Sequence, residues 1–179
     1  MPNLKILANQ GVQYSNAWVG QLRNDTPPGQ TTMATGTFPK NDGILGFSWK
    51  DPKTGKAVNV TSWDAVTSGL MTKTITESGC TSIGTLAKKA YPEAKVVAIS
   101  SDKYYAAAGL GAESADYIIF SKNDKSTDPK TKGAKIFSPT GVIGHLAPLE
   151  IMNDPDLKRI KKGNTTGDTW AIDLAIKML

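Results

Sequence analysis

The tripeptide Thr26-Pro27-Pro28 holds the side chain in this sequence that is best placed to do chemistry. The residues at 12–19 before it have a strand-like composition, and small, helix-compatible residues follow it up to Gly36. We therefore expect Thr26 between a strand and a helix start, where unpaired N–H groups and the helix dipole favour an anion such as phosphate. Proline suits the first helical position, because its missing N–H would be unpaired there in any case.

A threonine hydroxyl at this position has two possible roles. As an N-cap, it would accept a hydrogen bond from a backbone N–H of the first turn, which stabilises a helix by about 1 kcal/mol. As a nucleophile, it would need its high pKa lowered, for example by a bound metal ion. The local sequence favours the cap and leaves the nucleophile open.

The other reactive side chains are few. Cys80 is the single cysteine, which excludes an intrachain disulfide and a cysteine-rich metal site. The single histidine, His145, lies in a turn before a short predicted helix, and we expect a structural role for it. Four aspartates are expected to cap helices or lie at the surface: Asp64, Asp102, Asp116 and Asp173.

The composition is typical of a soluble globular protein. The 179 residues suffice for one domain, and 39% of them are hydrophobic and 21% charged. The net charge of +5 would attract an anionic substrate. Lysines are densest at 122–135 and 158–162, where aspartates and turn residues favour a solvated surface over nucleic-acid binding. We see no segment long enough to span a membrane and no signal peptide.

Strands and helices are expected to alternate along the chain. We expect helices at 2–10, 27 to about 36, 82–90, 103–110, 146–152, from 156, and at 166–179; strands at 12–19, 95–100, 117–120 and 134–137; a loop at 37–43; and a hairpin or flap at about 47–62. This order predicts an α/β domain whose largely parallel sheet is covered on both faces. In such sheets, ligands bind where strands end and helices begin.

Two blocks of the sequence resemble the alkaline phosphatase superfamily. The segment 2–17, with Pro-Asn-Leu, Leu-Ala, Gly-Val and Asn-Ala in that order, is similar to one found in its sulfatases and its type I phosphodiesterases/nucleotide pyrophosphatases. Thr26-Pro27-Pro28, then Thr32 to Pro39 and Asp42-Gly43-Ile44, resembles the phosphodiesterase pattern, which begins with the nucleophilic threonine. Weaker matches at 83–90, 115–117 and 168–173 extend the resemblance over nearly the whole chain.

This resemblance implies an alkaline-phosphatase-like three-layer αβα sandwich that hydrolyses phosphodiesters or nucleotide pyrophosphates. It implies two divalent metal ions, usually zinc, with Thr26 binding one of them and attacking phosphorus. The family's other metal ligands lie outside the matched blocks, so we expect residues 1–179 to form a single, incomplete domain that is inactive alone. The implied substrate is a small phosphate ester or nucleotide, not a nucleic-acid duplex, and the resemblance favours a location outside the cytoplasm.

Local departures from the family pattern leave alternatives open. Pro27 and Pro28 remove two N–H donors that could face a phosphate. The family's substrate-contacting asparagine aligns with Phe47, which makes Phe47 and the nearby Trp49 the candidate substrate-binding residues; Asp42 stands where the family often has histidine. One alternative is a non-catalytic pseudoenzyme or binding module of the same fold. Another is a sulfatase-like esterase, although Gln30 replaces the arginine of the sulfatase pattern.

Overall fold

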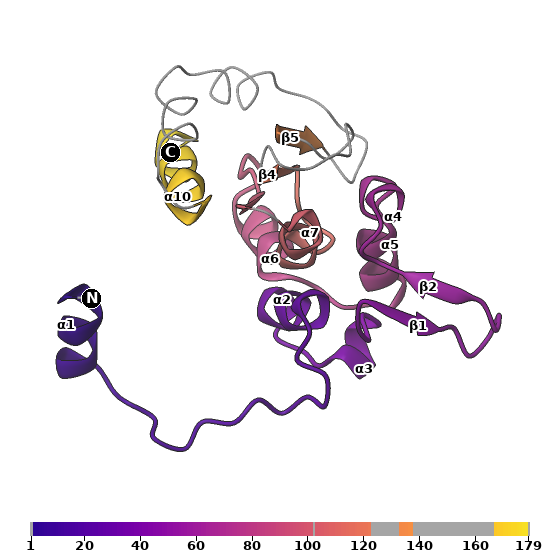
Figure 1. The fold of residues 1–179 in the computed structure, drawn as a ribbon, viewed down its shortest axis with the longest axis horizontal. Coiled ribbons are helices and arrows are strands. Elements are labelled where there is room, and N and C mark those ends of the chain that lie inside the picture. Colours follow the sequence, from indigo (N-terminus) through magenta and orange to yellow (C-terminus); the bar gives the residue numbers. More distant parts are fainter. Residues whose placement is uncertain (1, 102, 123–132, 138–166, 179) are drawn as a thin grey trace.

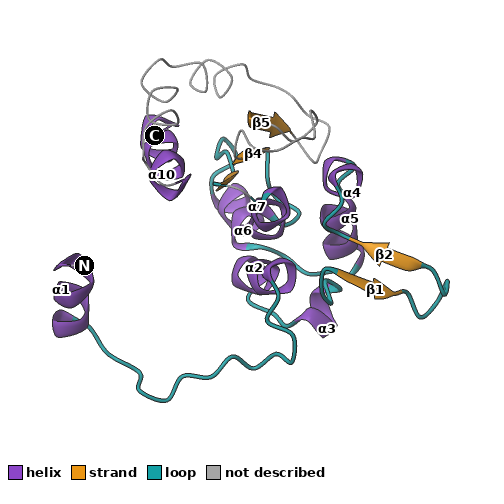
Figure 2. Cartoon of the chain, viewed as in Figure 1, coloured by secondary structure: helices purple, strands orange, loops and turns teal. Residues whose placement is uncertain are grey.

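The computed structural model describes residues 2–101, 103–122, 133–137 and 167–178 (Figures 1 and 2). Its elements are α1 (Pro2–Gln10), α2 (Thr26–Thr35), α3 (Pro39–Asp42), β1 (Ser48–Lys50), β2 (Ala57–Asn59), α4 (Trp63–Thr67), α5 (Leu70–Glu77), α6 (Ile83–Ala90), β3 (Val97–Ser100), α7 (Tyr104–Gly111), β4 (Tyr117–Lys122), β5 (Gly133–Phe137) and α10 (Gly167–Met178). In these ranges, no helix combines the length and the apolar character that a membrane crossing requires.

The main sheet has the strand order β3-β4-β5. β3 and β4 pair in parallel, with Val97 opposite Tyr117, whereas β5 runs antiparallel to β4. The strands predicted at 95–100, 117–120 and 134–137 are therefore confirmed, and the sheet is mixed rather than largely parallel. β5 is the next strand after β4 among the described residues, and it pairs with β4 in the antiparallel direction, with Ile118 opposite Phe137.

Helices cover both faces of this sheet (Figure 1). On one face, Ala98 and Ile118 join a buried cluster with Ala107 and Ala108 of α7, and α2 packs against α7 in turn. On the other face, Leu174 of α10 packs with strand residues. The mixed α/β class is shown by this arrangement. The complete alkaline-phosphatase-like sandwich and the single-domain organisation stay predictions.

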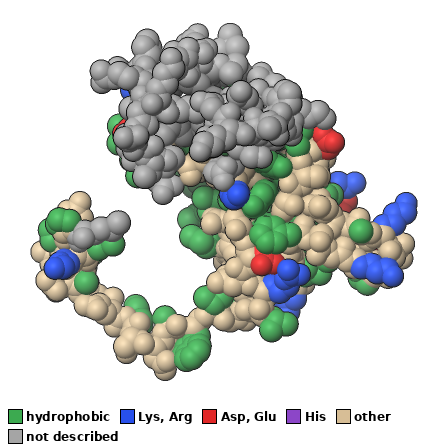
Figure 3. All heavy atoms as spheres, in the orientation of Figure 1, with side chains coloured by type: hydrophobic (Ala, Val, Ile, Leu, Met, Phe, Trp, Pro, Cys, Tyr) green, Lys and Arg blue, Asp and Glu red, His purple; other side chains and the backbone are tan. Residues whose placement is uncertain are grey.

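A β-hairpin occupies the stretch expected to form a hairpin or flap. Ser48 lies opposite Asn59 in the antiparallel pair of β1 and β2. The carboxylate of Asp51 accepts hydrogen bonds from the backbone N–H groups of Lys53 and Thr54, which closes the turn and holds the pKa of Asp51 below its ordinary value. Figure 3 shows basic side chains gathered at the tip of this hairpin.

The strand predicted at 12–19 is wrong. This stretch has no regular secondary structure and forms an extended connection from α1 to the rest of the described chain (Figure 2). Val12, Tyr14 and Trp18 are 80%, 81% and 86% exposed. Strand propensity expresses packing on a pleated, half-buried surface, and these side chains meet no such surface. Helix α1 forms as predicted, but it has no buried residue.

Other predictions need smaller corrections. The loop expected at 37–43 contains the single turn α3. Helices α4 and α5 were not predicted, because threonine is a weak helix former and their sequences contain several. In the structure, the hydroxyls of Thr67 and Thr74 donate hydrogen bonds to carbonyl groups one turn earlier. Asp116 is neither a cap nor a surface charge, since it binds Lys88 and the Val96 N–H. Asp102, His145 and the helices expected at 146–152 and from 156 lie outside the described residues.

Candidate active site

Helix α2 begins at Thr26, so Pro27 takes the second helical position rather than the first. Asp25 is the N-cap, with extended backbone angles (φ −70°, ψ 159°), yet its side chain makes no capping hydrogen bond. An N-cap side chain accepts from the N–H of the second or third helical residue. Pro27 and Pro28 fill those two positions and have no N–H to donate.

The Thr26 hydroxyl does not cap the helix either. The first N–H after the two prolines, that of Gly29, donates to the carbonyl oxygen of Asp25 at 2.9 Å and not to Thr26. Thr26 is half-buried, and its hydroxyl forms no hydrogen bond with other described residues. The capping role that the local sequence favoured is therefore not filled by this side chain.

An ion pair stands directly before Thr26. Nη2 of Arg23 lies 2.7 Å from Oδ2 of Asp25. The same buried oxygen has no hydrogen bond with good geometry, so charge attraction rather than an aligned N–H holds the pair. The guanidinium also rests against the backbone of Gly46, where a Cβ would lie only 3.2 Å from Nη1. The start of α2 thus has an ion pair beside it, in which the charge of Arg23 is balanced by that of Asp25.

Helix α7 fixes the first two turns of α2. Gly109 lies so close that a Cβ there would be 3.1 Å from the carbonyl oxygen of Pro27 and 3.2 Å from Oγ1 of Thr31. Pro27, Pro28 and Thr31 are buried. The Thr31 hydroxyl is fully buried and has no hydrogen-bond partner among the described residues. Backbone contact, rather than long side chains, therefore sets the position of this turn.

The two candidate substrate-binding residues differ in their surroundings. Phe47 follows Gly46, which links it through Arg23 and Asp25 to the start of α2. Its ring is 37% exposed and packs edge-on against Tyr105, with centroids 5.8 Å apart. Trp49 lies in β1, half-buried, and packs against the buried core cluster. The structure shows packing roles for both rings, and their roles in substrate binding stay predictions.

Asp42, which ends α3, is fully buried. Its Oδ1 accepts a hydrogen bond from the N–H of Ile44 at 2.8 Å, while Oδ2 has no partner in the described chain. Burial raises the pKa of Asp42 from 3.8 to about 6, and the Ile44 N–H opposes that rise. This carboxyl group therefore holds its proton to a higher pH than an exposed aspartate does.

The described residues do not fit a pair of metal ions. Nowhere in these ranges do three histidine, cysteine, aspartate or glutamate side chains come together in a metal-binding group. The carboxylate of Asp25, the residue directly before Thr26, is already paired with Arg23. Metal ligation usually needs three or four such donors. The implied ions would therefore need ligands beyond these residues.

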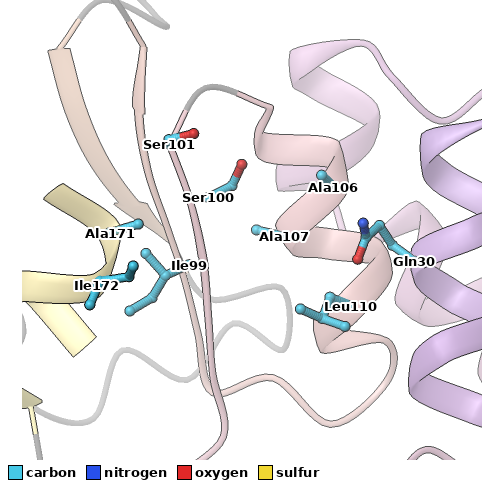
Figure 4. Close-up of a pocket in the computed structure, with 9 residues that line it drawn as sticks. All are labelled: Gln30, Ile99, Ser100, Ser101, Ala106, Ala107, Leu110, Ala171 and Ile172. Carbon is cyan, nitrogen blue, oxygen red and sulfur yellow. The ribbon is translucent and has the colours of Figure 1, made fainter. Parts of the chain in front are cut away.

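A cavity of about 300 Å³ lies at the carboxyl end of β3 (Figure 4). Gln30 of α2 reaches into it from one helical turn after Thr26, and Ser100 and Ser101 line it at the end of the strand. Carboxyl ends of parallel strands are the usual ligand sites of α/β sheets. Thr26 itself is not among the residues that line this cavity, so its place at a strand-end ligand site stays a prediction.

Sequence reasoning missed two residues that contact or adjoin the start of α2, Arg23 before it and Gly109 of α7. Arg23 is a basic residue three positions before Thr26, and a cation next to a helix N-terminus was the available signal. Gly109 interrupts a helical pattern, which often marks close packing of another backbone. Neither signal identifies the contacted residue. Arg23 rests against Gly46 and Gly109 against Pro27, and each partner lies far away in the sequence.

Comparison with known families gives one match. The family model described as type I phosphodiesterase/nucleotide pyrophosphatase matches residues 1–131, which include Thr26, Phe47 and Trp49. No curated protein and no solved structure matches the chain.

Proposed function

Because the chain belongs to the type I phosphodiesterase/nucleotide pyrophosphatase family, we propose that the complete protein hydrolyses phosphodiesters or nucleotide pyrophosphates with Thr26 as the nucleophile. By its description, this family consists of hydrolases of phosphodiester and pyrophosphate bonds. The substrate is a small phosphate ester or nucleotide, in keeping with the net charge of +5.

The Thr26 hydroxyl is the observation that carries the proposal. It stands at the positive end of α2, half exposed, and no hydrogen bond to another described residue occupies it. In the proposed reaction, Oγ1 bonds to phosphorus as the ester oxygen of the leaving group departs, and the hydroxyl proton passes to solvent. The departing oxygen takes up a proton from water. Water then attacks the phosphorus of the threonine ester, which releases the remaining phosphate monoester and restores the hydroxyl.

The proposal retains two divalent metal ions, zinc by family resemblance, with Thr26 as one ligand and the others outside the described residues. Bound ions of this kind stabilise negative charge on attacking and leaving oxygens. The contribution of the described residues is positional: Gly109 fixes the turn that carries Thr26, and Arg23 binds the carboxylate of Asp25, the residue directly before it.

A non-catalytic member of the same family is the competing proposal. The observation in its favour is that Pro27 and Pro28 stand at the second and third positions of α2. Backbone N–H groups at these positions are what a helix start offers to a phosphate, and prolines lack them. The sulfatase-like alternative has no such observation in its favour.

The test uses the full-length protein that carries this chain, supplied with zinc, and an aryl phosphodiester. We expect Thr26→Ala to lower kcat by at least about a thousandfold, because removal of a nucleophile abolishes the covalent route. Thr26→Ser should retain measurable turnover and form a covalent phosphoryl adduct visible by mass spectrometry. The matched control is Thr76→Ala, since Thr76 is exposed on α5. Equal rates above the uncatalysed rate would overturn Thr26 as the nucleophile, and a wild-type rate no higher than the uncatalysed one would favour the non-catalytic proposal.

A further inference from the structure

A groove of about 470 Å³ lies beside the segment that leads into α2. Its lining residues are Gly20 to Arg23, Phe38 to Lys40, and Leu45, and we call it the Phe38 groove. Its volume falls within the range of about 300–1,000 Å³ that is typical of ligand sites. Neither the family match nor the proposed nucleophile assigns a role to it.

The groove has fixed walls. The Phe38 ring rests on the backbone of Gly20, where a Cβ would lie 2.9 Å from the ring carbon Cζ. Opposite, the Gln21 amide accepts a hydrogen bond from the Thr32 hydroxyl at 2.9 Å and donates one to Asn24 at 3.2 Å. These bonds anchor one wall to α2. The ring is held in place while 45% of Phe38 stays exposed.

The groove combines positive charge with apolar surface. Arg23 and Lys40 line it; Arg23 is paired with the carboxylate of Asp25, whereas Lys40 forms no ion pair with another described residue. Leu22, Phe38 and Leu45 supply exposed apolar surface. In Figure 3, basic, acidic and hydrophobic side chains lie next to each other over α2 and α3. A ligand that matches both properties carries an anionic group joined to an apolar or planar one.

The ion pair connects this groove to the proposed nucleophile. Arg23 lines the groove and also binds the carboxylate of Asp25, the residue directly before Thr26. A phosphate ester whose phosphorus lies at the Thr26 hydroxyl can therefore extend its ester group past Arg23 toward Phe38.

We propose that the Phe38 groove binds the organic group of a phosphate ester. The apolar or planar group lies against the Phe38 ring, and an anionic oxygen lies near Arg23 and Lys40. Phe38 is then a specificity-determining residue for the reaction. The assignment of the groove to a substrate rests on the proposed function, but binding of an organic phosphate there does not require hydrolysis.

The first experiment measures binding without turnover. Full-length Thr26→Ala protein is titrated calorimetrically with adenosine monophosphate, hexyl phosphate and inorganic phosphate. We expect at least one organic phosphate to bind more tightly than inorganic phosphate; the preferred one identifies a planar or an alkyl group as the natural occupant. Adding Phe38→Ala should weaken that binding about tenfold, as expected for loss of one aromatic contact to a ring.

Matched variants test whether the loss is local. Tyr91→Ala removes an aromatic residue that is 72% exposed at the end of α6, and it should leave binding unchanged. Gly20→Ala keeps the Phe38 ring but displaces it, so it should weaken binding in the same direction as Phe38→Ala. Lys40→Gln should reduce the salt dependence of binding, while Lys89→Gln on α6 should not.

The outcomes separate the two proposals. Equal binding of organic and inorganic phosphate, or equal losses in Phe38→Ala and Tyr91→Ala, would overturn the assignment of the groove. Retained hydrolysis by Thr26→Ala would overturn the nucleophile and leave the groove assignment to stand on binding. If both hold, the ratio of kcat/KM for the preferred organic ester to that for a dimethyl phosphate ester should fall about tenfold in Phe38→Ala.

Discussion

Gly109 of α7 and Pro27 of α2 approach each other so closely that a Cβ on the glycine would lie 3.1 Å from the proline's carbonyl oxygen. Pro27 follows Thr26 directly, so this contact sets the position of the turn that carries the proposed nucleophile. Both residues are buried, which means that neither backbone can retreat into solvent.

We expect Gly109→Ala to shift the first turn of α2 by a few tenths of an ångström. Catalysis depends on near-attack geometry, so kcat on an aryl phosphodiester should fall by roughly three- to tenfold. Gly29→Ala is the control, because a Cβ on Gly29 meets its nearest neighbour, Asn24 Oδ1, at an ordinary 3.4 Å. An unchanged kcat in a folded Gly109→Ala protein would contradict the positional role of α7.

The stabilities of two glycine variants should differ in sign. A Cβ on Gly84 of α6 would meet the hydroxyl of Ser114 and lie 2.9 Å from the Ser114 Cβ. Ser114 cannot move away easily, because its hydroxyl donates to the Gly111 carbonyl and accepts from Ser82. Gly84→Ala should therefore lower the free energy of unfolding by about 1–3 kcal/mol, whereas Gly29→Ala in α2 should raise it by up to about 1 kcal/mol.

Urea unfolding of both variants measures this difference. The double variant Gly84→Ala, Ser114→Gly removes the obstructing side chain and should regain part of the lost stability. Stabilisation by Gly84→Ala alone would show that the two side chains accommodate each other without cost.

The elements that carry strong local patterns could be predicted from the sequence. The apolar runs of β3 and β4 and the small residues of α7 form the buried contact in which Ala98 and Ala107 meet. The hairpin was readable because Asp51 and Gly55 mark its turn. In each case neighbouring residues alone decide the structure, so a sequence pattern carries the information.

Features that depend on distant partners could not be predicted. The residues around Tyr14 have strand composition, but a strand requires a neighbour, and none of the described strands pairs with them. Thr26 does not cap α2, because the two residues after it are prolines without an N–H and the N–H of Gly29 is already bound to the Asp25 carbonyl. The burial of Asp42 and the approach of Gly109 to Pro27 depend on tertiary packing alone.

Asp42 should make stability depend on pH. Burial raises its pKa to about 6, so the folded state binds this proton more tightly than the unfolded state, whose value is 3.8. The contribution is fully present below 3.8 and is lost as the pH rises through about 6. Asp42→Asn keeps an acceptor for Ile44 and removes the charge. It should raise the free energy of unfolding above about pH 6 by about 1–2 kcal/mol, after the cost of a buried amide.

Asp116 should show the opposite sign. Burial raises its pKa, but the hydrogen bonds from Lys88 and the Val96 N–H, with the charges of Lys88 and Lys95, outweigh burial and hold it below 3.8. Its Oδ2 lies 2.8 Å from Lys88 Nζ and 2.7 Å from the Val96 nitrogen. The stabilisation is present above 3.8 and is lost as the pH falls through the lowered folded value. Asp116→Asn should therefore destabilise the protein at neutral pH by about 1–2 kcal/mol, and less in acid.

The Asp42 and Asp116 variants control for each other. Both replace one aspartate by asparagine and change the net charge equally, so long-range charge effects act on both in the same way. Only the local surroundings differ: Asp42 Oδ2 has no partner in the described chain, whereas Asp116 Oδ2 binds a lysine and a backbone N–H. Urea unfolding of the two proteins in one pH series should give differences from the wild type of opposite sign at neutral pH. Differences of the same sign would show that overall charge, rather than burial and pairing, governs how these carboxylates affect stability.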